Sequence, residues 1–268
     1  MYKFGIIGVG KMGYAILKGI LNKNIFTKEE IILHVHSKER REYFNSLGFN
    51  TSFDLSYCLE NSEVVLLSIK PQIYDEIINK EYSVPCIISV MAGKRIKDLK
   101  KHFSKSFIVR SMPNTPSMIN EGVTTVSFES KSSKYYNLSK EILESISKIY
   151  EIDENLSDTL LPLNGSMPAY FNLFVKSFID ASIEHNVPYE LVKNLLLDSI
   201  EGSLKLLRES SESIDDQIKN VCSKGGTTIA GLNKLYEGSF QESIKECYEA
   251  CRNRSIELSN NNWHMYLK

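Results

Sequence analysis

Residues 4–13 of this 268-residue chain read FGIIGVGKMG, and this stretch decides the fold. A β-rich run comes first, three glycines follow with Gly-x-Gly-x-x-Gly spacing, and a helical pattern over residues 12–21 begins directly afterwards. Gly8 would allow a tight turn, Gly10 would let the backbone approach a pyrophosphate, and Gly13 would let the helix pack on the strand. The amides at the helix start would then face the phosphates. The segment predicts a dinucleotide-binding turn, and the alternative is a glycine turn that serves structure alone.

Short apolar runs rich in β-branched residues recur through the first 150 residues, separated by helix-length segments. They cover residues 31–36, 63–69, 86–90 and 107–110. Continuously apolar strands of that length predict a parallel sheet with both faces covered by helices. Thr27 and Glu30 have the spacing of a capping box before the second run.

From about residue 160 onward the chain shows only helical periodicity, over residues 169–184, 188–208 and 239–258. We therefore expect an α/β protein with two domains. Residues 1–160 would form a Rossmann-type NADP-binding domain, and residues 161–268 an all-α dimerisation and substrate domain.

The first of these helices is apolar on more than one face over residues 170–179. A helix that is apolar all round must be buried on all sides, and a domain of about 110 residues buries its surface incompletely. We predict a homodimer interface here. The alternative is a helix that is buried against neighbours in its own chain.

Composition excludes several classes of partner. The chain holds 32 Lys and Arg against 33 Asp and Glu, for a formal net charge of −1. Nucleic-acid and membrane-surface proteins favour a basic face, so we expect neither partner. Five scattered cysteines and the absence of a secretion signal before the first strand predict a cytoplasmic protein with reduced thiols. Cys247 and Cys251 lack further residues at metal-site spacing, so we expect no metal.

The segment after residues 31–36 indicates which dinucleotide binds. An NAD site normally has Asp or Glu about 20 residues beyond the glycines. Here Ser37 and Lys38 are followed by Arg40 and Arg41, and a hydroxyl with positive charges suits a 2′-phosphate. We therefore predict a preference for NADPH. The alternative is a solvated helix start in which Glu39 serves NADH.

Strand ends supply further candidate contacts, because ligands of open α/β sheets bind beyond the carboxyl ends of strands. The candidates are Ser68, Ile69, Lys70 and Pro71 at the end of one run and Ala92 at the end of the next. Residues 110–116, RSMPNTP, form a proline-bracketed loop that either carries binding groups or is a structural turn.

A second glycine segment, SKGGTT at residues 223–228, predicts an anion pocket at a helix start. The two glycines allow backbone conformations that other residues avoid, and Thr227 and Thr228 would begin the helix. Exposed amides there would favour a carboxylate, whereas the alternative is a helix start without a ligand. The two glycine segments together predict a nicotinamide-dependent enzyme with a small acidic substrate.

Six motifs in this order resemble the pyrroline-5-carboxylate reductase family along essentially the whole chain. They are GVGKMG at residues 8–13, IKPQ at 69–72, AG at 92–93, R-x-MPNTP at 110–116, GSMPAY at 165–170 and GGTT at 225–228. The resemblance implies a Rossmann domain, a helical domain that interlocks with a second subunit, and an active site between those parts. It also implies NADPH or NADH as the donor, and a homodimer or a larger ring of dimers.

Carried over position by position, the resemblance implies roles for individual residues. Thr228 would be the catalytic residue, its hydroxyl bonded to the ring nitrogen of the substrate. Gly226, Thr227 and Thr228 would bind the substrate carboxylate, and Glu154 would lie near the substrate. With the candidates from the motifs, the expected cofactor-binding residues are Gly8, Gly10, Lys11, Met12, Gly13, Ser37, Lys38, Ser68, Ile69, Lys70, Pro71, Ala92 and Asn220.

The resemblance implies the reduction of 1-pyrroline-5-carboxylate to L-proline by NAD(P)H, the last step of proline biosynthesis. Four features depart from the family pattern: Met167 replaces a glycine, Lys224 replaces a proline, an Asn near the cofactor is missing around residues 54–56, and residues 217–221 are one residue short. Two alternatives therefore stay open. One is a reductase of another cyclic imine carboxylate, such as the six-membered homologue, and the other is a non-catalytic paralogue that binds a dinucleotide.

Overall fold

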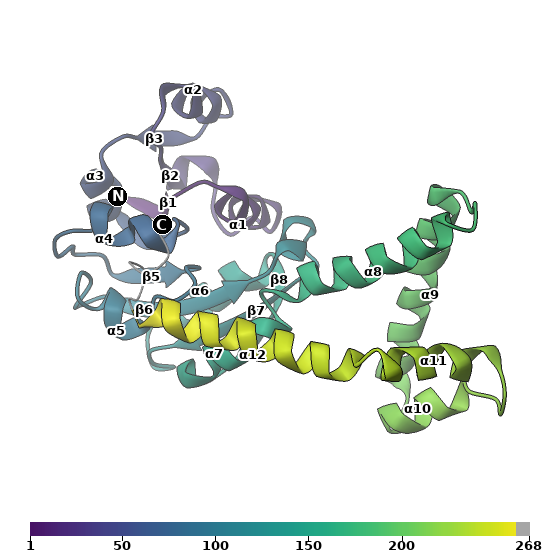
Figure 1. Ribbon diagram of the computed structural model, residues 1–268. Helices are drawn as coiled ribbons and strands as arrows, with labels where there is room; N and C mark the ends of the chain where they lie inside the picture. Colours follow the sequence, from purple (N-terminus) through teal and green to yellow (C-terminus); the bar gives the residue numbers. More distant parts are fainter. Residues whose placement is uncertain (261–268) are drawn as a thin grey trace. The chain divides into compact units, whose positions relative to one another are not determined.

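One eight-stranded sheet organises the first part of the chain, in a computed structural model that describes residues 1–260. The strand order is β3-β2-β1-β4-β5-β6-β7-β8 (Figure 1), and all neighbours pair in parallel except β6 with β7. The strands are β1 (Tyr2–Ile7), β2 (Ile31–His34), β3 (Asn50–Ser52), β4 (Ser62–Leu67), β5 (Cys86–Ser89), β6 (Phe107–Pro113), β7 (Gly122–Phe128) and β8 (Ser147–Glu151). The first six have the 3-2-1-4-5-6 order of a dinucleotide-binding sheet, which confirms the predicted fold class.

Both faces of the sheet are buried, because successive residues of a strand point to opposite faces. In β4, Val64 and Leu66 belong to one apolar cluster, whereas Val65 and Leu67 belong to the other. Helices cover the first cluster with α1 (Lys11–Asn22), α2 (Lys38–Ser46) and α6 (Tyr136–Glu144), and the second with α3 (Leu55–Glu60), α4 (Tyr74–Ile77) and α5 (Ile96–Leu99).

The predicted strands correspond to β1, β2, β4, β5 and β6, whereas β3, β7 and β8 were not predicted. Their sequences, NTS, GVTTVSF and SKIYE, are too polar to be recognised as buried strands. The capping box is present, and the Thr27 amide donates to the Glu30 carboxylate over 3.0 Å. The short connecting helices are η1 (Lys28–Glu30), η2 (Pro71–Ile73), η3 (Thr115–Ile119), η4 (Glu154–Leu156), α7 (Ser157–Leu160) and η5 (Leu161–Leu163).

Residues 169–250 form a second compact unit, and residues 251–260 belong to the sheet unit. The remaining helices are α8 (Met167–Ile183), α9 (Tyr189–Glu209), α10 (Ile214–Asn220), α11 (Thr227–Glu237) and α12 (Phe240–Ser259). No strand follows β8 within residues 1–260, which confirms the helical character predicted for this part. The division into a cofactor domain and a substrate domain at residue 160 stays a prediction.

The helical unit leaves most of its side chains exposed. Among residues 169–250 only Ile179 and Val192 are buried. Its exposed large apolar side chains include Leu173, Phe174, Phe178, Leu191, Leu195, Leu204, Leu206, Val221, Tyr236, Phe240 and Ile244. Leu173 in α8 is 65% exposed, which argues against a helix that is covered by its own chain. Apolar patches of this kind mark interaction surfaces.

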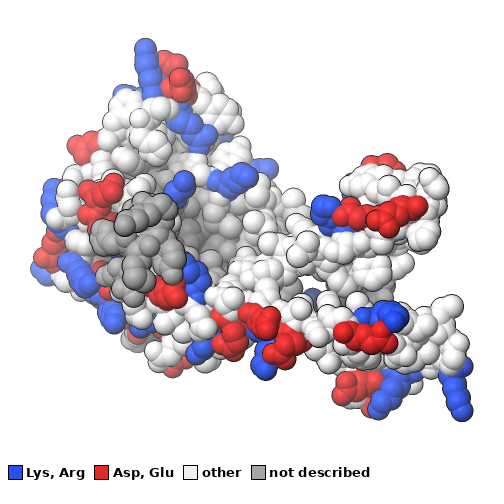
Figure 2. Space-filling view, in the orientation of Figure 1, with Lys and Arg blue, Asp and Glu red and all other residues white. Residues whose placement is uncertain are grey.

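Charged side chains of both signs lie beside one another on the visible face of the molecule (Figure 2). None of the helices within residues 1–260 combines the length and apolar character that a membrane crossing requires. In the same part of the chain, no three His, Cys, Asp or Glu side chains gather into a group that could hold a metal. All five cysteines are free thiols, and burial raises the pKa of Cys58 and of Cys86 to about 12.

Candidate functional site

The glycine turn between β1 and α1 packs tightly against the end of β4. Gly8 has φ +93°, and a Cβ there would lie 2.6 Å from the carbonyl oxygen of Ser68. A Cβ on Gly13 would collide with the carbonyl oxygen of Gly8. Gly10 differs, because no described atom lies within 4 Å of the position its Cβ would take. The first and third glycines therefore serve packing, whereas the second faces the open space that a closely approaching ligand requires.

Helix α1 begins with backbone amides that its own turns leave unpaired. Gly10 is the N-cap and makes no side-chain capping bond, and the amide of Tyr14 donates to the Gly10 carbonyl over 2.9 Å. The amides of Lys11, Met12 and Gly13 have no partner inside the helix. They lie at the positive end of the helix dipole, where an anion is stabilised.

A cavity of about 870 Å³ opens at the carboxyl ends of β1, β2 and β4. Six of the predicted cofactor residues line it, namely Gly8, Gly10, Lys11, Ser68, Ile69 and Lys70. The other lining residues are Val9, Tyr14, His34, Val35, His36, Arg40, Tyr43 and Ile73. Its volume lies in the range of small-molecule sites, and its place at the strand ends is where open α/β sheets bind ligands.

Other predicted cofactor residues lie around this cavity without lining it. The Ser37 hydroxyl accepts the Arg40 amide over 3.2 Å as the N-cap of α2. Lys38 is exposed and pairs with Glu42 over 3.9 Å. Met12 packs partly buried against the core, and Pro71 begins η2. These positions stay predicted contacts, and their observed partners are local.

Of the basic residues at positions 38–41, Arg40 lines the cavity. Its guanidinium donates to the Val9 carbonyl in the glycine turn and lies 4.7 Å from the centre of the Phe44 ring. Arg41 instead lies 4.9 Å from the Phe53 ring. Helical spacing could have identified this set, because Arg40 and Tyr43 are three residues apart on α2 and share a face.

His34 lies at the end of β2 and lines the same cavity. Burial lowers its pKa below the usual value, and the charge of His36, whose ring lies 6.2 Å away, acts in the same direction. The imidazole is therefore neutral at neutral pH. It can hydrogen-bond at the cavity wall without adding a second positive charge beside Arg40.

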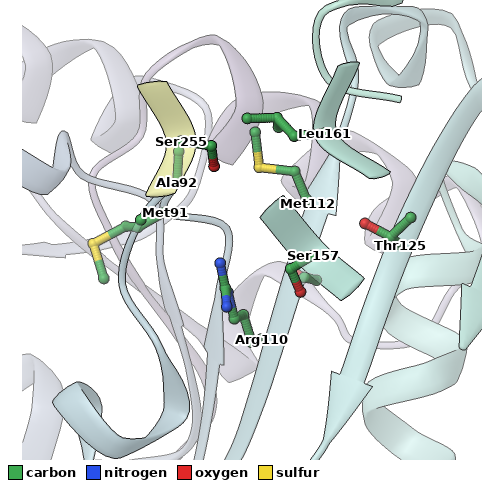
Figure 3. Close-up of a pocket in the computed structure, with 10 residues that line it drawn as sticks. Met91, Ala92, Arg110, Met112, Thr125, Ser157, Leu161 and Ser255 are labelled. Carbon is green, nitrogen blue, oxygen red and sulfur yellow. The ribbon is translucent and has the colours of Figure 1, made fainter. Parts of the chain in front are cut away.

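A much smaller pocket lies at the carboxyl ends of β5 and β6 (Figure 3). It is lined by Met91, Ala92, Gly93, Arg110, Ser111, Met112, Thr125, Ser157, Leu161 and Ser255. Ala92, which we predicted at the cofactor, is part of this wall. The later part of the 110–116 segment is a structural turn, because the Asn114 side chain accepts the Val123 amide over 2.9 Å.

Glu154 is held by groups of the protein beside this pocket. Its Oε1 accepts the Ile96 amide over 2.8 Å and the Arg110 guanidinium over 3.3 Å. Asp158, one turn further on, accepts hydrogen bonds from Ser255 and Ser259 of α12. The sequence motifs did not indicate Asp158, since its partners are about a hundred residues away.

The second glycine segment lies in the helical unit and begins α11. Gly225 has φ +71°, and a Cβ on Gly226 would collide with the Ser223 hydroxyl. Gly226 is the N-cap without a side-chain capping bond, and the exposed Thr227 and Thr228 are the first helical residues, which confirms the predicted helix start. Their amides have no intrahelical partner and are available to an anion.

Asn220, predicted at the cofactor, is the last residue of α10. Its side-chain amide donates to the Glu212 carboxylate over 2.9 Å. Both residues belong to the helical unit.

Two family models match different parts of the chain. Residues 3–93 match the family model described as NADP oxidoreductase coenzyme F420-dependent, and residues 154–258 match that of pyrroline-5-carboxylate reductase dimerisation. The pyrroline-5-carboxylate reductase of Synechocystis is 32% identical over 262 residues, which cover 96% of this chain and 98% of the relative. The chain belongs to the pyrroline-5-carboxylate reductase family.

Other members of the pyrroline-5-carboxylate reductase family agree in sequence and in fold. The Arabidopsis thaliana enzyme is 30% identical, with 96% of each chain covered. The crystal structure of the Plasmodium falciparum reductase with NADP bound is 30% identical and has a TM-score of 0.87, covering 96% of this chain and 98% of that one. The Streptococcus pyogenes reductase has a TM-score of 0.87 at 28% identity, over 95% and 98%.

Proposed function

We propose that this chain reduces 1-pyrroline-5-carboxylate to L-proline with NADPH, the last step of proline biosynthesis. The observation that carries the proposal is the family relationship over 96% of the chain. Both glycine segments support it. Each begins a helix whose first amides lack intrahelical partners, one in the sheet unit and one in the helical unit.

The residues of the large cavity fit a phosphorylated dinucleotide. Gly10 leaves room for the pyrophosphate, and the first amides of α1 would bind it. Arg40, beside the end of β2, would pair with the 2′-phosphate. When bound, the reduced nicotinamide supplies the hydride, and the protein supplies binding and orientation.

The substrate would bind through the start of α11. The amides of Thr227 and Thr228 would hold its carboxylate, and the Thr228 hydroxyl would orient the ring nitrogen. The Gly226 amide, predicted to join them, donates to the Ser223 carbonyl over 3.0 Å in this structure. The cyclic imine accepts the hydride once its nitrogen is protonated, with the proton coming from solvent or from the substrate itself. Because that proton does not come from the protein, the chain needs no general acid. Holding the two reactants in contact can lower the barrier by about 7–11 kcal/mol.

The exposed apolar side chains of the helical unit support a homodimer or a larger homo-oligomer. We assign cofactor binding to residues 1–160 and dimerisation with substrate binding to residues 161–268. A cytoplasmic location is supported by five cysteines that all remain free thiols.

The test is NADPH oxidation by the purified protein, with pyrroline-5-carboxylate, its six-membered homologue, or no imine. We expect rapid turnover with the five-membered ring. Turnover with the larger ring alone would assign the chain to another cyclic imine. NADPH binding without turnover on either ring would leave a dinucleotide-binding paralogue.

Thr228→Ala tests whether the Thr228 hydroxyl orients the ring nitrogen of the substrate. We expect turnover to fall about 10- to 100-fold, because the ring nitrogen loses its hydrogen-bond partner, while NADPH affinity is unchanged. Thr227→Ala is the matched control, since it keeps the amide and removes a hydroxyl without an assigned role. Loss of NADPH binding in Thr228→Ala would contradict the assignment.

A further inference from the structure

Within the sheet unit, the last turns of α12 are hydrogen-bonded to one buried carboxylate, that of Asp158. Its Oδ1 accepts the Ser255 hydroxyl over 2.7 Å and the Ser259 hydroxyl over 3.1 Å. Its Oδ2 lies 3.4 Å from the Arg95 guanidinium, and Arg110 lies 3.8 Å from its Oδ1. Two hydroxyls one helical turn apart and two guanidiniums therefore converge on a single side chain.

A second carboxylate completes this cluster. The Arg110 side chain is only 8% exposed and pairs with Glu154 over 3.3 Å. Glu154 also accepts the Ile96 amide over 2.8 Å at the start of α5. A buried charge is tolerated when it is paired and its hydrogen bonds are satisfied. The cluster thus ties β6, η4, α7 and the start of α5 to the end of α12.

The same end of α12 packs directly on the loop that follows β5. Gly93 has φ +74°, and a Cβ there would lie 3.2 Å from the backbone carbonyl carbon of Leu258. Ala92, Arg110 and Ser255 line the small pocket together. Figure 3 shows the Arg110 guanidinium directed from β6 toward the α12 segment that carries Ser255. The cluster therefore sets one wall of this pocket.

This pocket lies next to the large cavity along the sheet. The cavity covers the carboxyl ends of β2, β1 and β4, and β5 is the next strand in the sheet order. A dinucleotide bound with its adenosine end at β2 would extend across the ends of β1 and β4 and place its nicotinamide end at β5. As the structure describes it, the cavity is lined by none of the four charged residues of the cluster and by neither serine.

We infer that Asp158 is a positioning residue for hydride transfer, which rests on the proposed function. By holding residues 255–259 against residues 91–93, it fixes the wall at which the nicotinamide ring and the imine meet. Asp158 acts through Ser255, Ser259 and Arg110 and need not touch either reactant. Its loss should therefore change the rate of the chemical step and leave the binding of the cofactor's adenosine end intact.

Asp158→Asn tests this inference in the full-length protein, because it removes the charge and keeps the size of the side chain. The measurement is a single turnover of NADPH-loaded enzyme with saturating pyrroline-5-carboxylate, followed by stopped flow. We expect the rate constant to fall about ten-fold or more, since small misplacements of reactants are costly, with the amplitude retained and the Kd for NADPH within two-fold. A purely structural role would reduce the amplitude at an unchanged rate constant, and that result would overturn the inference.

Two further variants support this test. Ser255→Ala with Ser259→Ala keeps all charges of the cluster, so it should fold even where Asp158→Asn does not, and it should lower the rate constant in the same direction. Glu129→Gln is the matched control, because Glu129 likewise pairs with a basic side chain, Lys100, accepts a backbone amide, that of Ile108, and lines neither pocket. It should leave the rate constant unchanged.

Amide hydrogen exchange separates this inference from the proposed function, because it needs no turnover. In the double serine variant, exchange in residues 91–96 and 251–259 should accelerate about ten-fold or more, while exchange in β1 and β4 stays as in the unmodified protein. Unchanged exchange in both segments would overturn the inference. Accelerated exchange in a protein that reduces no imine would contradict the proposed function alone.

Discussion

The sheet unit and the helical unit bury their apolar side chains in different ways. The sheet unit completes two apolar clusters by itself, one on each face of the sheet. The helical unit buries only Ile179 and Val192 among residues 169–250. One unit therefore completes its own apolar core, whereas the other leaves an apolar surface of the kind that marks interaction sites.

The two glycine segments are divided between these units, and this division has a functional consequence. The segment at residues 8–13 lies on the sheet unit, and the segment at residues 223–228 lies on the helical unit. Under the proposed function, cofactor binding should survive the loss of assembly and catalysis should not.

The largest effect should come from a charge on the apolar surface of the helical unit. Leu173→Glu should weaken assembly about 1000-fold or more, because burying an unpaired carboxylate costs several kcal/mol. NADPH binding should persist while turnover is lost. Analytical ultracentrifugation and NADPH titration measure the two outcomes.

The matched control is Ile119→Glu, on a side chain of the sheet unit that is 73% exposed. It should leave both assembly and turnover unchanged. If Leu173→Glu sediments like the unmodified protein, the helical unit is not the interface, and the comparison between the two units fails.

An effect of intermediate size should distinguish the glycine that serves cofactor binding from the glycine that serves packing of the turn, both in the sheet unit. Gly10→Ala points a methyl group into open space, so the protein should keep its unfolding temperature while the Kd for NADPH rises about 10- to 100-fold, because the pyrophosphate can no longer approach the backbone. Gly13→Ala collides with the Gly8 carbonyl and should lower the unfolding temperature itself. Calorimetry and fluorescence titration check both variants, and equal NADPH affinity in Gly10→Ala would remove this turn from the cofactor site.

The smallest effect should be a pH dependence of stability, and it should be confined to the sheet unit. The pKa of His34 is lowered by burial from its unfolded value of about 6.5. Between the two values the unfolded chain binds more protons, so stability falls as the pH drops below about 6.5 toward the folded pKa. His34→Gln should lessen that loss, because glutamine does not titrate.

Urea unfolding of the full-length protein measures the free energy of unfolding of the sheet unit at pH 7.5 and at pH 5. The measurement is made at two protein concentrations. His185→Gln is the control, since His185 is exposed in the helical unit. An equal loss of stability on acidification in His34→Gln and in the unmodified protein would contradict the prediction.

The sequence by itself determined the features that are encoded within about ten neighbouring residues. The turn at residues 8–13 and the start of α11 at Thr227 depend on φ values and close approaches that only glycine permits. Residues 64–67 of β4 and 86–88 of β5 are apolar without a break, because both faces of the sheet are covered. Local backbone sterics and burial explain why these parts could be predicted.

Only the tertiary structure decided the features that join distant residues. Arg40 lines the cavity whereas Lys38 pairs on the surface, because the packing of α2 on the sheet selects which face turns inward. The short polar strand β3 exists through its pairing with β2. Asp158 meets Ser255 across 97 positions of sequence. No local spacing encodes such a contact, since the fold alone brings the two residues together.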